Sequence, residues 1–104
     1  MDPEASRSER VLITGASSGI GLATSIEFAD RGARIALIAR DVSGLQSSAD
    51  QVRARGGDPL VTSASVTDRV ALEVAVERAA AAFGGLDVAL INAAATPTGH
   101  SRRQ

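Results

Sequence analysis

The chain alternates short, almost uniformly apolar runs with longer segments in which apolar and polar positions repeat every three or four residues. The run from Ile35 to Ala39 is apolar throughout, as expected for a parallel strand that is covered on both faces. Pro59 is tolerable because it opens its run, where a strand does not need that N–H group. We therefore predict four strands, at residues 11–14, 35–39, 59–64 and 86–91.

The three longer segments have the period of amphipathic helices. They run from residue 20 to about residue 31, from the region of Ser43 to Gly56-Gly57, and from about residue 67 to residue 83. Ser43 and Gln46 have the spacing of a capping box at the start of the second helix. The side chains predicted to be buried are Leu22, Ile26 and Ala29, then Leu45, Ala49 and Val52, then Leu72, Val76, Ala79 and Phe83.

Four strands that alternate with three helices of this length predict an α/β fold. Each helix is long enough to connect parallel strands by a right-handed crossover, so the sheet is expected to be parallel. Residues 1–9 are expected to be a flexible N-terminus and residues 96–104 a disordered tail.

The turn between the first strand and the first helix is the segment that indicates a ligand-binding site. Its sequence is Thr14-Gly15-Ala16-Ser17-Ser18-Gly19-Ile20-Gly21. A strand that ends in a glycine-rich turn and leads into a helix presents free N–H groups and the positive end of the helix dipole to one point, which stabilises an anion. The candidate pyrophosphate-binding residues are Gly15, Ser17, Ser18, Gly19, Ile20 and Gly21. The alternative is a turn that only joins a strand to a helix.

The pattern Thr-Gly-x-x-x-Gly-x-Gly differs from the G-x-G-x-x-G dinucleotide fingerprint and resembles that of the short-chain dehydrogenase/reductase family. The resemblance covers residues 10–95. It implies an NAD(P)-binding Rossmann-like half-domain with strand order 3-2-1-4, which is an incomplete doubly wound fold. It also implies an oxidoreductase that moves hydride between NADP(H) or NAD(H) and a carbonyl or alcohol.

Arg40 follows the second strand, where family members select their cofactor. A carboxylate there accepts hydrogen bonds from the ribose 2′-OH, whereas an arginine favours a 2′-phosphate. Ala39 supplies no carboxylate and Arg40 supplies a cation, so the resemblance favours NADP, with NAD as the other possibility. Alternatively, Arg40 is a solvated strand end or pairs with Asp41.

Ser65 and Val66 follow the third strand, where the family usually has Asp and an aliphatic residue that contact adenine. A serine hydroxyl still accepts a hydrogen bond, but without charge, so adenine is expected to bind more weakly. The alternative is that Ser65 or Thr67 caps the next helix.

Asn92 and Ala93 occupy the position of the family's Asn-Asn-Ala-Gly turn, which lies under the cofactor ribose on the nicotinamide side. Ala94 replaces the final glycine and adds a methyl group there. Asn92 as a purely structural turn residue is the alternative.

Catalysis in the family uses a Tyr and a Lys, and these 104 residues contain neither. We expect the chain alone to be inactive, so a non-catalytic nucleotide-binding module or sensor is the alternative function. No catalytic residue is assigned. The lone His100 lacks neighbouring ligand side chains, and no metal site is predicted.

Composition and charge limit the classes of partner that the chain is expected to bind. The net charge is −1 and the basic residues are scattered arginines, so neither a nucleic-acid face nor a membrane-binding patch is indicated. Cysteine is absent and no apolar run reaches membrane-spanning length, so a cytoplasmic location is expected. The fourth strand is expected to form an open apolar edge, through which the chain associates with itself.

Overall fold

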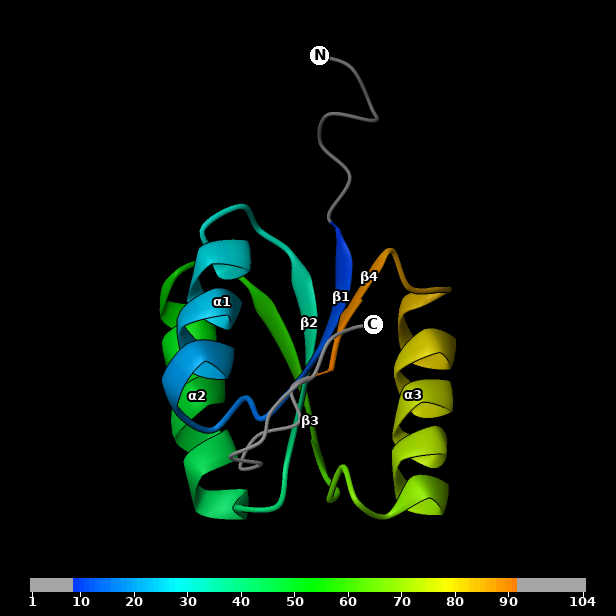
Figure 1. Cartoon of the computed structure of the whole chain (residues 1–104). Helices are drawn as coiled ribbons and strands as arrows, with labels where there is room; N and C mark the ends of the chain where they lie inside the picture. Colours follow the sequence, from blue (N-terminus) through cyan, green and yellow to red (C-terminus); the bar gives the residue numbers. More distant parts are fainter. Residues whose placement is uncertain (1–8, 92–104) are drawn as a thin grey trace.

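A computed structural model describes residues 9–91, in which strands and helices alternate along the chain (Figure 1). The elements are β1 Arg10–Thr14, α1 Gly19–Ala29, β2 Arg34–Ala39, α2 Val42–Ala54, β3 Asp58–Ser63, α3 Arg69–Phe83 and β4 Val88–Leu90. The strands form one parallel sheet in the order β3-β2-β1-β4. This confirms the predicted α/β class and the strand order. Asn92, Ala93 and the predicted tail at residues 96–104 lie outside the described residues, as do residues 1–8 of the predicted N-terminal segment.

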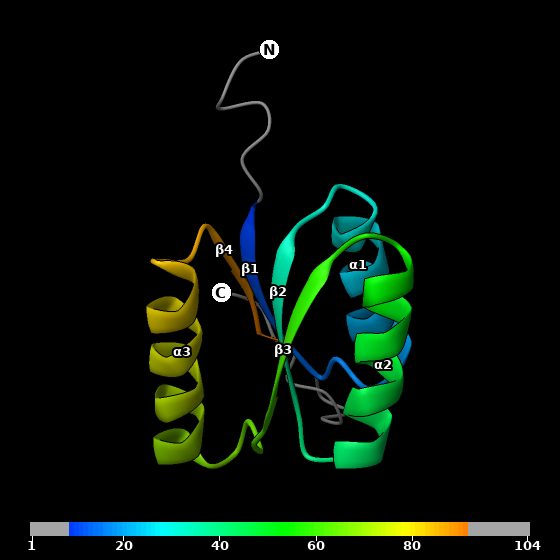
Figure 2. The same ribbon diagram turned by 180° about the vertical axis from the view of Figure 1, so that it is seen from behind.

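The sheet separates two apolar cores. Helices α1 and α2 cover one face and α3 covers the other, as Figures 1 and 2 show from opposite sides. Alternate residues of β1 and β2 enter the two cores, so that Ile13 and Leu37 lie under α1 and α2 while Leu12 and Ile38 lie under α3. Burial of both faces explains why the central strands are apolar at every position.

Helices α1 and α3 bury smaller side chains at some positions than their apolar pattern predicts. In α1 the buried residues are Gly21, Ser25 and Ala29, whereas Leu22 and Ile26 are only half-buried. In α3, Ala75 joins Ala79 and Phe83 in the core, and Leu72 and Val76 are half-buried. In these two helices the predicted burial of Ala29, Ala79 and Phe83 is confirmed, whereas the predicted burial of Leu22, Ile26, Leu72 and Val76 was wrong. The predicted stripe of α2, Leu45, Ala49 and Val52, is confirmed.

The N-termini of α2 and α3 also differ from prediction. Asp41 precedes α2, and Ser43 lies inside the helix with its hydroxyl donating to Asp41 Oδ1 at 3.1 Å, so the predicted capping box does not form. Asp68 caps α3, because its carboxylate accepts the Ala71 N–H at 3.1 Å. An aspartate is the N-cap residue of both helices, but only Asp68 forms a side-chain capping hydrogen bond.

At the amino end of the sheet, an arginine and a carboxylate join β4 to β1. Arg10 donates from its main-chain N–H, Nε and NH2 to the Asp87 carboxylate at 2.9–3.1 Å, and the Asp87 N–H donates to the Arg10 carbonyl at 2.7 Å. Arg10 NH1 also donates to the Gly84 carbonyl at 2.9 Å. The hydrogen bond to Asp87 raises the pKa of Arg10, so the guanidinium stays charged at all ordinary pH values.

The strand β4 pairs with β1 and with no other strand among residues 9–91, so it forms an edge as predicted. The strand is shorter than predicted, and Ile91 beyond it is 52% exposed. Within the described range, no helix is both long and apolar enough to cross a bilayer.

Candidate functional site

The glycine-rich turn lies at the carboxyl end of β1, in the middle of the sheet. Gly15 and Gly19 have φ values of 65° and 61°, a region that favours glycine. A Cβ on Gly19 would meet no protein atom within 4 Å, so the glycine here is required by backbone conformation and leaves open space beside the turn. The turn also lies where the strand order reverses between β1 and β4, which is the usual position of ligands in open α/β sheets.

Gly21 fixes how closely the helix approaches the turn. A Cβ on Gly21 would overlap the carbonyl oxygen of Gly15 and would lie 3.1 Å from the Ala16 Cα atom. Only glycine permits this contact, which holds the first turn of α1 directly against the preceding loop. Gly15 and Gly21 therefore shape the same contact, in which the main chain of the turn packs against the main chain of the helix.

The first turn of α1 is open to solvent and lacks a side-chain cap. Ser18 is the extended N-cap residue, but its side chain forms no capping hydrogen bond. The Leu22 N–H donates to the Ser18 carbonyl at 3.3 Å, so the helical bonding begins only there. Ser18, Gly19 and Ile20 are exposed, and Ile20 is 77% exposed despite its apolar side chain. The amides at this end of the helix are available to an anion.

The turn is anchored to its neighbours on both sides of Ala16, which is itself buried. The Ala16 N–H donates to the Ile38 carbonyl of β2 at 3.2 Å. The buried hydroxyl of Ser48, on α2, donates to the Ala16 carbonyl at 2.8 Å. Sequence reasoning did not find Ser48. The available signal was a polar residue next to the buried stripe of an amphipathic helix.

Arg40 lies at the same end of the sheet, directly after β2, and is exposed. Asp41 is its neighbour in sequence, but no ion pair joins them, nor does Arg40 form one with any other residue in the range 9–91. The Gly44 amide and then the Ser43 hydroxyl lower the pKa of Asp41, so this carboxylate is ionised at neutral pH. The site therefore presents one cation and one anion at the start of α2.

Ser65 and Val66 follow β3 at the same end of the sheet and are half-buried. The Ser65 hydroxyl lies 2.7 Å from the Thr67 hydroxyl and accepts the Thr67 N–H at 3.2 Å. Neither residue caps α3, so that alternative was wrong. A hydroxyl has one donor and two acceptor positions, and these two contacts leave it limited capacity for a further hydrogen bond.

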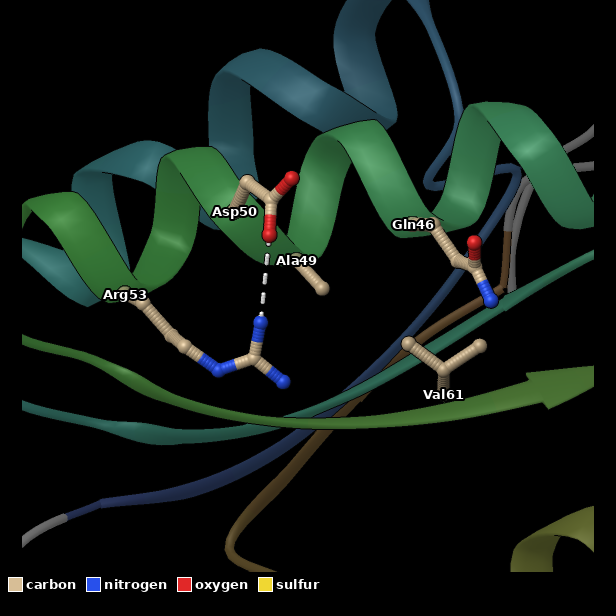
Figure 3. Close-up of a pocket in the computed structure, with 5 residues that line it drawn as sticks. All are labelled: Gln46, Ala49, Asp50, Arg53 and Val61. Atoms are coloured by element: carbon tan, nitrogen blue, oxygen red, sulfur yellow. Dashed lines mark hydrogen bonds and ion pairs between the residues drawn. The ribbon is translucent and has the colours of Figure 1, made fainter.

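The strand order brings the predicted site residues within the range 9–91 to one end of the sheet. The turn after β1 lies next to Arg40 after β2, and Ser65 follows one strand further out. A separate hollow of about 330 Å³ lies between α2 and the edge strand β3 (Figure 3). It is lined by Gln46, Ala49, Asp50, Arg53 and Val61, and contains none of the predicted site residues. In the described part of the chain no cluster of His, Cys, Asp or Glu is suited to a metal ion.

The family model described as short chain dehydrogenase matches residues 9–104. The chain belongs to the short-chain dehydrogenase family. An uncharacterized oxidoreductase of Listeria monocytogenes is 37% identical over 87 residues, which are 84% of this chain and 35% of that relative. The predicted resemblance is thereby confirmed.

Solved structures of family members include complexes with both nicotinamide cofactors. The L-sorbose reductase of Gluconobacter frateurii, solved with NADPH and L-sorbose, is 37% identical with a TM-score of 0.76, covering 86% of this chain and 35% of that one. An NADH-dependent reductase solved with NAD is 33% identical with a TM-score of 0.75, covering 83% and 36%. The chain thus spans about a third of the length of each of these three proteins.

Proposed function

We propose that residues 10–95 bind an NAD(P) dinucleotide and form the cofactor-binding part of a short-chain dehydrogenase/reductase oxidoreductase. The observation that carries the proposal is the uncapped first turn of α1, held by Gly21 against a turn in which Gly15 and Gly19 have positive φ. This arrangement supplies converging N–H groups and the positive end of a helix dipole, which suit a pyrophosphate. Gly15, Ser17, Ser18, Gly19, Ile20 and Gly21 form this binding segment.

The bound cofactor would supply a hydride-transferring nicotinamide to a carbonyl or alcohol substrate. Within these 104 residues there is no Tyr and no Lys, which the family uses for proton transfer. The role assigned to this chain is therefore to hold and orient the cofactor. A non-catalytic nucleotide-binding module or sensor is the second candidate, and the same missing residues favour it. Turnover of NADPH with ketones by the chain alone would exclude this second candidate.

We propose NADP(H) as the preferred cofactor. Arg40 is exposed and unpaired among the described residues, beside the glycine turn, and Ala39 supplies no carboxylate to accept the ribose hydroxyls. Asp41 opposes a second phosphate by charge, but the Gly44 amide and the Ser43 hydroxyl partly offset that charge. Family structures with NADPH and with NAD both exist, so the preference depends on Arg40.

The remaining roles are assigned from the resemblance to the family. We propose that Ser65 and Val66 contact the adenine, and Asn92 and Ala93 the ribose on the nicotinamide side. Because Thr67 already engages the Ser65 hydroxyl, we expect adenine to be held mainly by the apolar contact with Val66.

A pair of glycine variants tests the proposal. Gly19 and Gly32 have similar φ values, 61° and 76°, and a Cβ on either would meet no atom within 4 Å. Alanine at either position therefore introduces similar backbone strain, about 1–2 kcal/mol. Only Gly19→Ala places a methyl group beside the proposed pyrophosphate site. We expect it to abolish the increase in NADPH fluorescence on binding, which the Trp- and Tyr-free chain does not obscure.

Gly32→Ala is the matched control and should bind NADPH like the wild type. Equal binding by both variants would contradict the assigned site, and an absence of binding by the folded wild-type chain would contradict the function.

We also propose that β4 pairs with β4 of a second copy of this chain. Residues 88–91 carry neither charge nor proline, whereas the opposite edge strand, β3, begins with Asp58 and Pro59. Sedimentation should show a dimer or larger species that Ile91→Lys converts to monomer. A monomeric wild-type chain at micromolar concentration would contradict self-association.

A further inference from the structure

Helix α2 contacts the glycine turn at two points that lie one helical turn apart. Gly44 is packed so closely that a Cβ there would lie 2.9 Å from the Ser17 Cβ atom. Four residues later, the buried Ser48 hydroxyl donates to the Ala16 carbonyl at 2.8 Å. Residues four apart lie on the same face of a helix, so one face of α2 supports two successive residues of the turn.

The hydrogen bond from Ser48 fixes the direction of the N–H at the other side of the same peptide group. All peptide bonds of the described chain are trans, and in a trans peptide the carbonyl and the following N–H point in opposite directions. Because the Ala16 carbonyl is directed to a buried hydroxyl on α2, the Ser17 N–H is directed away from α2. The Ala16 N–H is already used by Ile38 of β2. The peptide between Ala16 and Ser17 is therefore fixed in orientation.

We propose that Ser48 is a positioning residue, which orients the Ser17 amide for an anion by holding the Ala16 carbonyl. This inference rests on the proposed dinucleotide binding. Ser48 is buried and acts only through the turn, without contact with the ligand. Its contribution is preorganisation, since a turn that is already oriented loses less freedom when the ligand binds.

Ser48→Ala tests the inference, with Ser25→Ala as its control. Both serines are fully buried, and each hydroxyl donates one bond of 2.8 Å to a main-chain carbonyl. The Ser25 bond goes to Gly21, inside its own helix, and does not touch residues 14–18. Loss of either hydroxyl removes one buried hydrogen bond to a main-chain carbonyl, but only the Ser48 bond reaches the residues that precede α1.

Two measurements are made on the 104-residue chain and its variants. The first is the NADPH dissociation constant, for which we expect Ser48→Ala to give an increase of about three- to tenfold and Ser25→Ala less than twofold. The second, without cofactor, is hydrogen exchange of the Ala16 amide relative to the Asp58 amide, which is bonded to Ala33 at the other end of the sheet. We expect Ala16 to exchange about tenfold faster in Ser48→Ala only.

Unchanged affinity together with unchanged Ala16 exchange in Ser48→Ala would overturn the inference. Equal losses in the two serine variants would also overturn it, because they would indicate general destabilisation. If the wild type bound no NADPH while Ala16 exchange still depended on Ser48, the proposed function would fail and the structural restraint would stand. Should Ser48→Ala not fold, Ser48→Cys, with a weakly donating thiol, replaces it with the same expectations.

Discussion

At the amino end of the sheet, Arg10 and Asp87 satisfy each other through main-chain and side-chain hydrogen bonds, whereas at the carboxyl end the first turn of α1 has no side-chain cap. Both ends contain charged or polar groups close to β1. At the amino end these groups face one another, and at the carboxyl end Ser18, Gly19 and Arg40 face solvent.

The difference separates groups that stabilise the sheet from groups that remain available to a ligand. A bidentate ion pair between β1 and β4 fixes the register of an edge strand. Exposed amides at a helix N-terminus contribute little to stability but bind an anion well. We therefore expect substitutions at the two ends to have separable effects on unfolding and on cofactor affinity.

The largest expected effect is that of Gly21→Ala. The added methyl group would overlap the Gly15 carbonyl oxygen, which is main chain and cannot rotate away. We expect NADPH affinity to fall at least about 100-fold, with a loss of about 1–3 kcal/mol in the free energy of unfolding from overpacking. Fluorescence titration and urea denaturation measure the two quantities.

Gly57→Ala is the matched control at the opposite end of the sheet. Its methyl group would lie 2.8 Å from Val52 Cγ1 and 2.9 Å from Ala29 Cβ. It should destabilise the chain through overpacking without changing NADPH affinity in the remaining folded protein. A comparable loss of affinity in both variants would remove the distinction between the two ends.

Arg40→Ala should alter cofactor choice more than stability. Removing the guanidinium is expected to weaken NADPH about tenfold while leaving NADH nearly unchanged, since only NADPH carries the 2′-phosphate. Arg53→Ala, which removes an exposed cation of α2 paired with Asp50, serves as the control. An equal loss of affinity for NADPH and NADH in Arg40→Ala would show that the arginine does not bind the 2′-phosphate.

Asp87→Asn should have the reverse pattern. It removes the charge that Arg10 contacts at the amino end, so the midpoint of thermal unfolding should fall by several degrees. NADPH affinity should be unchanged when measured well below that midpoint. A weakened NADPH affinity in this variant would mean that the two ends are coupled through β1.

The smallest expected effect is the contribution of Asp41 to the pH dependence of the free energy of unfolding. Its pKa in the folded chain lies below the ordinary 3.8, chiefly because of the Gly44 amide. A lowered carboxyl pKa contributes stability above the unfolded value and loses it as the pH falls through the folded value. Between about pH 5 and pH 2, the free energy of unfolding should therefore fall less steeply with decreasing pH in Asp41→Asn than in the wild type. An identical acid profile would show that Asp41 is not stabilised in the fold.

The strands and the glycine turn could be predicted because each depends on local sequence. The strand order depends on distant pairings and was predicted only through the family resemblance. Apolar runs such as 35–39 identify buried parallel strands, and the spacing of Gly15, Gly19 and Gly21 identifies the turn. The buried face of α1 could not be predicted from periodicity. The contact of Gly21 with Gly15 holds the helix so close that Ser25 and Ala29 fit against the sheet while Leu22 and Ile26 do not.

The hydrogen bond by which α2 supports the glycine turn could not be predicted from the sequence either. In the sequence, Ser48 resembles any polar residue of a helix. Only the fold brings it against the carbonyl of Ala16, which lies 32 residues earlier in the chain. The occupied hydroxyl of Ser65 is a similar case, because its partner, Thr67, becomes evident only from the loop geometry. Motifs report local backbone requirements, whereas the Ser48 contact depends on how separate elements pack and the Ser65 contact on the path of a single loop.

The most direct measurement is an NADPH titration of the ¹⁵N-labelled wild-type chain, followed by the amide resonances of both ends of the sheet. We expect saturable shifts at Ser17, Ser18 and Gly19, smaller shifts at Arg40 and Val66, and none at Arg10 or Asp87. Shifts confined to the amino end, or no shifts at millimolar NADPH in folded protein, would contradict dinucleotide binding at the glycine turn.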